Sequence, residues 1–259
     1  MTTTFTEQDV KDSSDSQPDH SDLGKSSFLK NLRLIAIIGV IVALFAIVIA
    51  NSSTRQSPAD QVWNEATTIG NLDAKNYYVM YTDLICPYCD VFSRVVMDNW
   101  DEFTAYLDEH DILFEVRLTD YLYEASNIEY SRAAAEGAYC AMRENKFWDY
   151  YHGAIKTLWE DYHSKGIGDS KTSPSIKNLP SDYWLNIGHA AGLGDDFDNC
   201  VNNHESVAEI EANTRRAAQV ANGMPTFKFN QFTTYGFDPS WDWDYVKMYL
   251  DAGLEKSQN

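Results

Sequence analysis

The most apolar stretch of the chain lies near its beginning. From Leu34 to Ala50 the sequence runs for 17 positions without a charged or polar side chain. As a helix this stretch is about 25 Å long at about 1.5 Å per residue, which is close to the thickness of a bilayer core. Leu32 extends it if the side chain of Arg33 reaches back to the lipid surface. We therefore expect residues 32–50 to be a transmembrane helix that anchors the chain in the lipid bilayer.

The flanking charges predict how this helix is oriented. Three basic residues precede it closely and one follows it: Lys25, Lys30 and Arg33 before, Arg55 after. The positive-inside rule then places the N-terminus in the cytoplasm and residues 51–259 outside, in a single-pass cell-membrane protein. A cleaved signal peptide is the alternative, because Val48-Ile49-Ala50 resembles a cleavage site. An uncleaved signal anchor is favoured, since the apolar run exceeds the usual length for such a peptide. In both cases the bulk of the chain lies where disulfides persist.

Polar segments separate this anchor from a folded domain. Residues 1–31 are rich in Ser, Thr, Asp and Gln and predict a disordered cytoplasmic tail. Residues 51–72 predict a linker. From there to residue 259 the apolar positions become periodic, which indicates one folded domain over residues 73–259.

The first half of that domain alternates between strand and helix patterns. Asn76–Leu84 and Ile112–Leu118 are β-rich runs short enough for buried strands. Between them, apolar residues recur at helical spacing from Val91 to Leu107. Strand, helix, strand predicts a βαβ unit with a parallel sheet.

Helical patterns dominate the middle of the domain, and strands return near its end. The expected helices are Asn127–Glu144, Lys146–His163, a helix with Ser181 as N-cap that ends at Gly192 or Gly194, Asp195–Asn202 and Glu205–Ala221. Thr226–Asn230 and Phe232–Phe237 predict a hairpin, and a last helix opens at Ser240 and Trp241. The fold class is therefore α/β, with a helical insertion over about residues 124–221.

Charge and composition exclude some functions. The formal net charge is −19, so a nucleic-acid partner, which needs a basic footprint, is not expected. The 44% hydrophobic content is ample for a packed core.

The candidate chemistry lies at Cys86-Pro87-Tyr88-Cys89, where the first predicted strand gives way to a helix. A helix N-terminus carries free N–H groups and a partial positive charge, which favour a thiolate. In such motifs a thiol pKa falls from about 8.5 to between about 3.5 and 7.5. Pro87 suits the first helical turn. We expect Cys86 to be the exposed nucleophile and Cys89 to be more buried and to resolve the mixed disulfide.

Two other interpretations of this motif are half of a zinc site and a static structural disulfide. A zinc site would need a second C-x-x-C or a pair of histidines at ligand spacing, and the sequence has neither. We expect no metal and no other cofactor.

A second candidate element is Gly223-Met224-Pro225-Thr226, directly before a predicted strand. A proline between a helix end and a strand start is a candidate for a cis peptide bond. An ordinary trans proline at the start of an edge strand is the alternative, and local sequence alone does not favour the cis form.

Three stretches of this chain resemble the DsbA-like branch of the thioredoxin superfamily. Thr82–Cys89 is similar to its active-site stretch, Ala133–Tyr151 to its insertion helices, and Asp198–Pro225 to the run before its cis-proline loop. The similarity covers about residues 76–254. It implies a thioredoxin-like fold with a helical insertion, a cis Pro225 near Cys86, and disulfide exchange by Cys86 and Cys89.

The chain also departs from that family. Tyr88 stands where the best-known enterobacterial members have histidine, and C-P-Y-C also occurs in glutaredoxins, which are reductants. The acid that many relatives carry six residues before the first cysteine is Met80 here. Asp83 is the nearest acid, either as a substitute for it or, as we favour, as a solvated carboxylate. The large Met224 before the proline is expected to tune substrate contact.

Cys140 and Cys200 lie in separate predicted helices. Three interpretations are open: the two cysteines form a structural disulfide, they remain buried free thiols, or they exchange with the active pair. Some members of the resembled family carry a second disulfide in the helical domain, so the structural disulfide is favoured.

The leading functional hypothesis is an extracytoplasmic oxidase. Its partners would be exported proteins with free cysteines and a membrane redox partner that reoxidises the pair. The alternatives are a disulfide reductase or isomerase, and a non-catalytic peptide-binding module of the same fold.

Overall fold

The computed structural model describes residues 64–168, 176, 179–238 and 240–258. The predicted tail (1–31), the predicted anchor (32–50) and the linker up to residue 63 lie outside the described residues. Within the described ranges, no helix combines the length and the apolar character that a membrane span requires.

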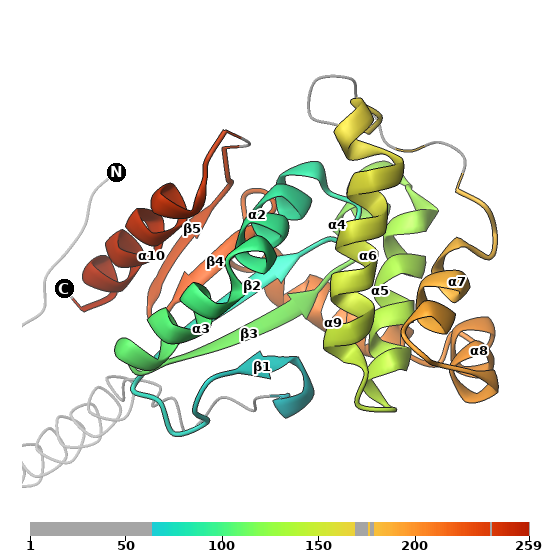
Figure 1. The fold of residues 1–259 in the computed structure, drawn as a ribbon, viewed down its shortest axis with the longest axis horizontal. Coiled ribbons are helices and arrows are strands. Elements are labelled where there is room, and N and C mark those ends of the chain that lie inside the picture. The colour runs from blue at the N-terminus through green and yellow to red at the C-terminus, as the bar shows by residue number, and fades with distance from the viewer. Residues whose placement is uncertain (1–63, 169–175, 177–178, 239, 259) are drawn as a thin grey trace, which may run out of the picture. The chain divides into compact units, whose positions relative to one another are not determined.

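Strands and helices follow in the order shown in Figure 1. They are η2 (Glu65–Thr67), β1 (Thr68–Ile69), β2 (Asn76–Thr82), α2 (Pro87–Asp98), α3 (Trp100–Glu109), β3 (Ile112–Leu118), α4 (Tyr121–Ser126), α5 (Glu129–Met142), α6 (Phe147–Asp161), η3 (His163–Lys165), α7 (Tyr183–Ala190), α8 (Asp195–Asn202), α9 (Val207–Ala218), β4 (Thr226–Phe229), β5 (Phe232–Tyr235) and α10 (Trp243–Gln258).

One sheet organises these elements, with the strand order β1-β3-β2-β4-β5. β2 and β3 are parallel, with Asn76 opposite Ile112 and Thr82 opposite Leu118, which confirms the predicted βαβ unit. β4 is antiparallel to β2, and β5 is antiparallel to β4. β1 pairs with β3 at the other edge, so part of the predicted linker belongs to the sheet. Two strand residues are too few to produce a periodic pattern.

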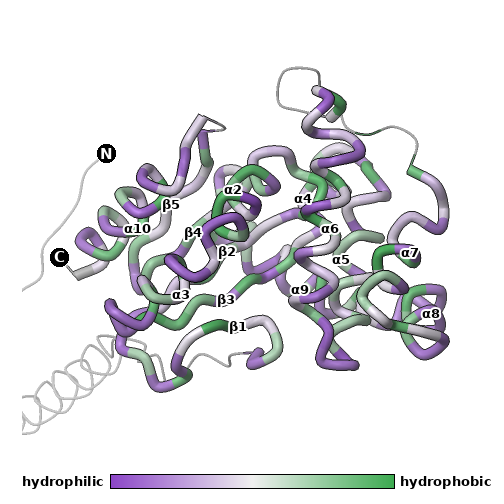
Figure 2. Tube along the Cα trace, viewed as in Figure 1, coloured by the Kyte–Doolittle hydropathy of each residue, from purple (hydrophilic) through white to green (hydrophobic). Residues whose placement is uncertain are grey.

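The two faces of β2 belong to different clusters. Tyr78 and Met80 pack in the larger core with residues of α2, α3 and α10. Tyr77, Val79 and Tyr81 alternate with them and pack with residues of α9 and with both cysteines of the C-x-x-C motif. The sheet is therefore buried on both faces, which explains why the sequences of its central strands are continuous apolar runs rather than alternating ones. In Figure 2 hydrophobic and hydrophilic colours alternate along α2 and α10, as expected for helices with one face on a core.

The helix predicted between the first two strands is two helices. Asn99 has φ −124° and ψ 39°, which ends α2 and begins α3. Its side-chain amide donates to the carbonyl oxygen of Val95 at 2.8 Å, and its carbonyl accepts from the Phe103 amide at 2.9 Å. The helical spacing of apolar residues continues across this break, so the pattern did not reveal it. The short α4 was also missed, and Asp182 rather than Ser181 occupies the N-cap of α7.

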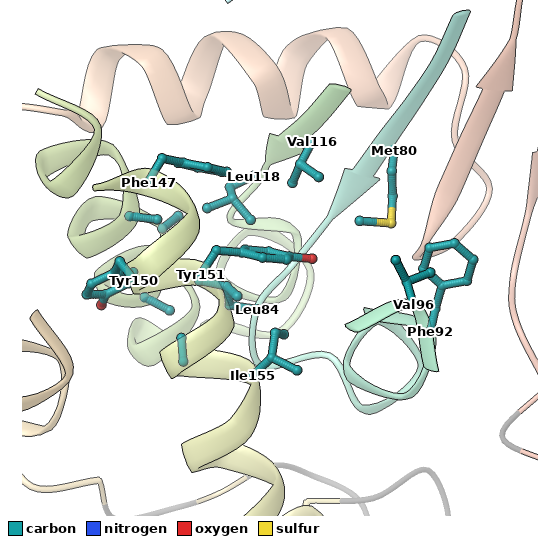
Figure 3. Close-up of a cluster of buried hydrophobic side chains, with 14 of the residues drawn as sticks. Met80, Leu84, Phe92, Val96, Val116, Leu118, Phe147, Tyr150, Tyr151 and Ile155 are labelled. Atoms are coloured by element: carbon teal, nitrogen blue, oxygen red, sulfur yellow. The ribbon is translucent and has the colours of Figure 1, made fainter. Parts of the chain in front are cut away.

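The insertion between β3 and β4 shares the core of the sheet. In Figure 3 Tyr151 and Ile155 of α6 lie near Leu84, which follows β2, and Leu118 of β3. Phe92 and Val96 of α2 belong to the same cluster. The insertion is thus packed against the segment that carries the C-x-x-C motif.

A disulfide joins two helices of the insertion. Cys140 of α5 and Cys200 of α8 are bonded, are separated by 60 residues, and are both buried. The loop that they close contains α6 and α7. Cross-linking a loop of this length removes entropy from the unfolded chain and stabilises the fold by up to about 4 kcal/mol.

We predict that Cys140→Ser together with Cys200→Ser lowers the free energy of unfolding by up to about 4 kcal/mol. Urea unfolding followed by circular dichroism measures this. Adding a reductant to the wild-type protein should give a similar loss if the bond is accessible after unfolding. An unchanged urea midpoint in the double variant would contradict a stabilising role for the disulfide.

Candidate active site

The C-x-x-C motif stands at the junction of β2 and α2. After β2 ends at Thr82, the Cys86 amide donates to the carbonyl oxygen of Asp83 at 3.0 Å. Cys86 is the N-cap of α2 and Pro87 is its first residue. The Asp90 amide then donates to the Cys86 carbonyl at 2.9 Å, as the first helical hydrogen bond. This turn holds the Cys86 sulfur at the positive end of the helix.

Both cysteines are thiols in the structure, and both are buried. Cys86 is 5% exposed and Cys89 is 0% exposed, so the expectation that Cys86 is exposed was wrong. The reason is that Met224 packs in the same small cluster, with the half-buried Tyr88 against it. Cys86 remains the more accessible of the two sulfur-bearing residues.

The proline loop lies beside Cys86. The Met224–Pro225 peptide bond is cis, and the Met224 carbonyl oxygen is 4.0 Å from the Cys86 Sγ. Tyr81 of β2 pairs with Thr226 of β4, so the residues before Thr226 lie next to the chain that leads into Cys86. The loop is fixed from β5 as well, because the Gly236 amide donates to the Pro225 carbonyl at 2.8 Å.

The two thiols differ electrostatically. Burial raises the pKa of the Cys89 thiol well above its usual range, and the neighbouring Cys86 sulfur raises it further. The Asp83 amide and the Thr82 hydroxyl act in the opposite direction but are the weaker influences. Cys89 is therefore the partner that stays protonated.

Asp83 is fully buried, so its interpretation as a solvated carboxylate was wrong. Its oxygens accept from the Ile85 amide at 3.1 Å, the Leu122 amide at 2.9 Å and the Ser131 hydroxyl at 2.5 Å. Burial raises the pKa of Asp83 to about 6, although these donors lower it. The carboxyl group joins the turn before Cys86 to α4 and α5.

Met80, six residues before Cys86, provides no titratable group. It lies on the face of β2 opposite to the one that packs with the two cysteines. Figure 3 shows it near Phe92 and Val96 of α2, in the larger core. Within the described ranges, no cluster of three or more His, Cys, Asp or Glu side chains is arranged to hold a metal ion.

The sequence interpretation missed an acid–base pair at this site. Asp90, in the first turn of α2, has its Oδ2 2.5 Å from Nδ1 of His163 in η3. Burial raises the pKa of Asp90, while His163 and Arg94 lower it. The acid directly after Cys89 is visible in the sequence. Its partner, 73 positions away, carries no local signal.

The chain matches the thioredoxin family over residues 64–252 and belongs to that family. With a free dithiol at the start of α2, it is one of the thiol–disulfide oxidoreductases of the thioredoxin superfamily. The fold inferred from the DsbA-like resemblance, a thioredoxin-like fold with a helical insertion, is thereby confirmed.

Solved structures share the fold at low identity. A thioredoxin-like oxidoreductase from Silicibacter pomeroyi is 17% identical, with a TM-score of 0.53 over 78% of this chain and 99% of that one. A periplasmic thioredoxin-like protein from Salmonella enterica is 17% identical, with a TM-score of 0.51 over 77% and 97%. The thiol-disulfide exchange protein alpha-DsbA2 from Wolbachia pipientis is 16% identical, with a TM-score of 0.51 over 75% and 90%. No curated protein matches the chain.

We predict that Asp83 makes stability depend on pH. Its pKa is 3.8 when unfolded and about 6 when folded, so its stabilising contribution is present below about pH 4 and is lost as the pH rises through 6. Asn has no charge to titrate. The advantage of wild type over Asp83→Asn in unfolding free energy should therefore fall by roughly 2 kcal/mol between pH 4 and pH 7.

Urea unfolding of both proteins at several pH values measures this difference. Asp108→Asn, at an exposed position on α3, is the control, and its difference from wild type should stay nearly constant. A pH-independent effect of Asp83→Asn would refute the assignment.

Proposed function

We propose that this chain is a membrane-anchored oxidoreductase that introduces disulfides into exported proteins outside the cytoplasm. One observation carries the proposal. The Cys86 sulfur lies at the start of α2 and 4.0 Å from the carbonyl oxygen of Met224, the residue before Pro225. A thiolate-stabilising helix end and an irregular backbone edge for an extended peptide therefore meet at one sulfur atom.

The proposed reaction begins with a disulfide between Cys86 and Cys89. A substrate thiolate attacks Cys86 Sγ, a mixed disulfide forms, and Cys89 leaves and takes up a proton. A second substrate thiolate then attacks the substrate sulfur of the mixed disulfide and releases the Cys86 thiolate. The substrate dithiol loses two electrons and two protons. The pair gains both electrons and one proton, as a Cys86 thiolate and a Cys89 thiol, and the second proton goes to solvent. A membrane redox partner then accepts the two electrons, the Cys89 proton is released, and the disulfide is regenerated.

Different environments suit the two sulfurs to these roles. Burial raises the pKa of the Cys89 thiol, whereas the Cys86 sulfur lies at the start of α2, where the helix end favours a thiolate. Met224 contributes both its carbonyl and a buried side chain to the surroundings of Cys86, so its size is expected to restrict how a peptide approaches.

We predict that Cys86→Ser abolishes oxidation of a model dithiol peptide by the oxidised protein, because the attacked sulfur is gone. Cys89→Ser should accumulate a mixed disulfide with a cysteine peptide that had been activated as a disulfide, because no resolving thiol remains. Mass spectrometry after acid quenching detects both results. The double variant Cys140→Ser with Cys200→Ser is the control and should retain exchange while it is folded. Equal activity in Cys86→Ser and wild type would instead favour the non-catalytic peptide-binding module.

The direction of exchange is decided by the reduction potential of the Cys86/Cys89 pair. For an oxidase we expect a value nearer to the −120 mV typical of strong oxidants than to the −270 mV of thioredoxin, both approximate. Equilibration with glutathione buffers, followed by alkylation and mass spectrometry, measures it. A potential of about −270 mV would rule out the oxidase and favour the reductase or isomerase.

The proposed location rests on residues 32–50, for which the apolar run predicts an anchor. The Cys140–Cys200 disulfide is in keeping with an oxidising compartment. One structural relative is described as periplasmic. We propose that residues 51–259 face that side of the membrane, with the N-terminus in the cytoplasm.

We expect the full chain to stay in the membrane fraction after an alkaline carbonate wash, because about 17 apolar residues remain in the bilayer core. A chain that starts at residue 51 should be released by the same wash. Protease added to spheroplasts should degrade the domain of the full chain. A mature N-terminus directly after Ala50 would show that the segment is a cleaved signal peptide.

A further inference from the structure

A buried pair of an acid and a histidine lies at the N-terminal turn of α2, the helix that carries the dithiol. Asp90 follows Cys89 directly in α2, and His163 occupies η3 at the end of α6. Their side chains are joined at 2.5 Å and are 0% and 2% exposed, respectively. The pair therefore belongs to the contact between the dithiol helix and the insertion, away from solvent.

Apart from their contact with each other, the polar atoms of Asp90 and His163 have few partners. Among the residues that the structure describes, Asp90 Oδ1 and His163 Nε2 have no hydrogen-bond partner. A carboxylate in a dry interior is costly unless an opposite charge or several donors accompany it. In the described part of the chain, His163 is the one hydrogen-bond partner of the Asp90 carboxylate, so the charge of that carboxylate depends on His163.

Other charged and titratable groups approach the pair from three elements. On α2, Arg94 is attractive to Asp90, but it also pairs with Asp98 at 2.7 Å and lies partly at the surface. Tyr151 of α6 interacts electrostatically with both Asp90 and Cys89. Tyr183 of α7 also interacts with Asp90. Of these groups only Arg94 is a permanent cation, and its charge is shared with an exposed acid.

We infer that Asp90 and His163 act as one net-neutral pair, in which the histidine keeps a buried carboxylate from opposing the Cys86 thiolate. The inference rests on the proposed exchange at Cys86. His163 is a positioning residue in this role, because it acts through Asp90 and not on the reacting sulfur. Asp90 lies four residues after Cys86 in the first turn of α2, where its amide bonds the Cys86 carbonyl. At such a spacing, a like charge in a protein of effective dielectric about 20 shifts a titration by on the order of one pH unit. An uncompensated Asp90 would therefore offset part of what the helix end provides.

The test uses His163→Gln in the reduced full-length chain in detergent. Glutamine keeps a hydrogen-bonding group of similar reach but cannot take up a proton. The pH midpoint for iodoacetamide alkylation of Cys86 should rise by about one unit. The reduction potential should fall by about 30 mV, which is the equivalent of a tenfold change in the equilibrium.

The double variant Asp90→Asn with His163→Gln separates charge from packing. Removing the carboxylate as well should return the alkylation midpoint to near the wild-type value. Damage to packing would leave the double variant as impaired as the single one. Asp108→Asn, which removes an exposed acid from the neighbouring helix α3, should leave the midpoint unchanged because solvent screens that charge.

Two results would overturn the inference: an unchanged midpoint in folded His163→Gln, or a raised midpoint that Asp90→Asn fails to reverse. If His163→Gln does not fold, Asp90→Asn alone gives the test. Its midpoint should be equal to or below that of wild type, and a higher one overturns the inference. Failure of the proposed function would look different, because wild type itself would then exchange no disulfide with a peptide.

Discussion

The antiparallel pairing of β2 with β4 is the constraint on which the site depends. β2 leads directly into Cys86, and β4 begins directly after Pro225, so their opposite directions bring the two segments to one end of the sheet. The register with Tyr81 opposite Thr226 places the Met224 carbonyl beside a sulfur that is 138 residues away in the sequence. If β4 ran parallel to β2, the proline loop would lie at the far end of the strands. The hairpin with β5 supports this arrangement through the bond from Gly236 to Pro225.

The insertion is joined to the dithiol segment by polar contacts as well as by apolar packing. Asp83 accepts from Leu122 of α4 and Ser131 of α5. Within α2, the Ser93 hydroxyl lies 2.6 Å from that of Tyr151 in α6, and Asp90 bonds His163. Hydrogen bonds in a largely apolar contact restrict geometry more than apolar packing alone, because a displaced partner leaves a buried polar group unsatisfied. The insertion therefore holds the start of α2 in a defined position.

Periodicity predicted the parts of the fold whose burial is regular. β3 and α8 have the predicted bounds, and β2 differs only at its end, where Leu84 is apolar but lies in a turn. The break at Asn99 was hidden because one residue changes backbone direction while the apolar spacing continues. The motif itself marked where the dithiol lies. Its burial did not follow from local sequence, because the residue that packs over Cys86 comes from a loop near the other end of the domain. The partner of Asp90 was hidden for the same reason.

Two buried carboxyl groups flank the dithiol, and if both were ionised and unpaired they would disfavour negative charge on Cys86. The charges of Asp83 and Asp90 are compensated in different ways. Asp83 has three neutral donors and a pKa of about 6, so part of its charge is removed by protonation in mildly acidic solution. Asp90 is hydrogen-bonded to His163, which together with Arg94 opposes the effect of burial on its pKa. Three of the four hydrogen-bond partners of these two acids come from the insertion: the amide of Leu122, the hydroxyl of Ser131 and the ring of His163. The electrostatic balance at the dithiol is therefore set jointly by the helix end and by the inserted helices, so changes in the insertion alter the chemistry of a sulfur that the insertion does not carry.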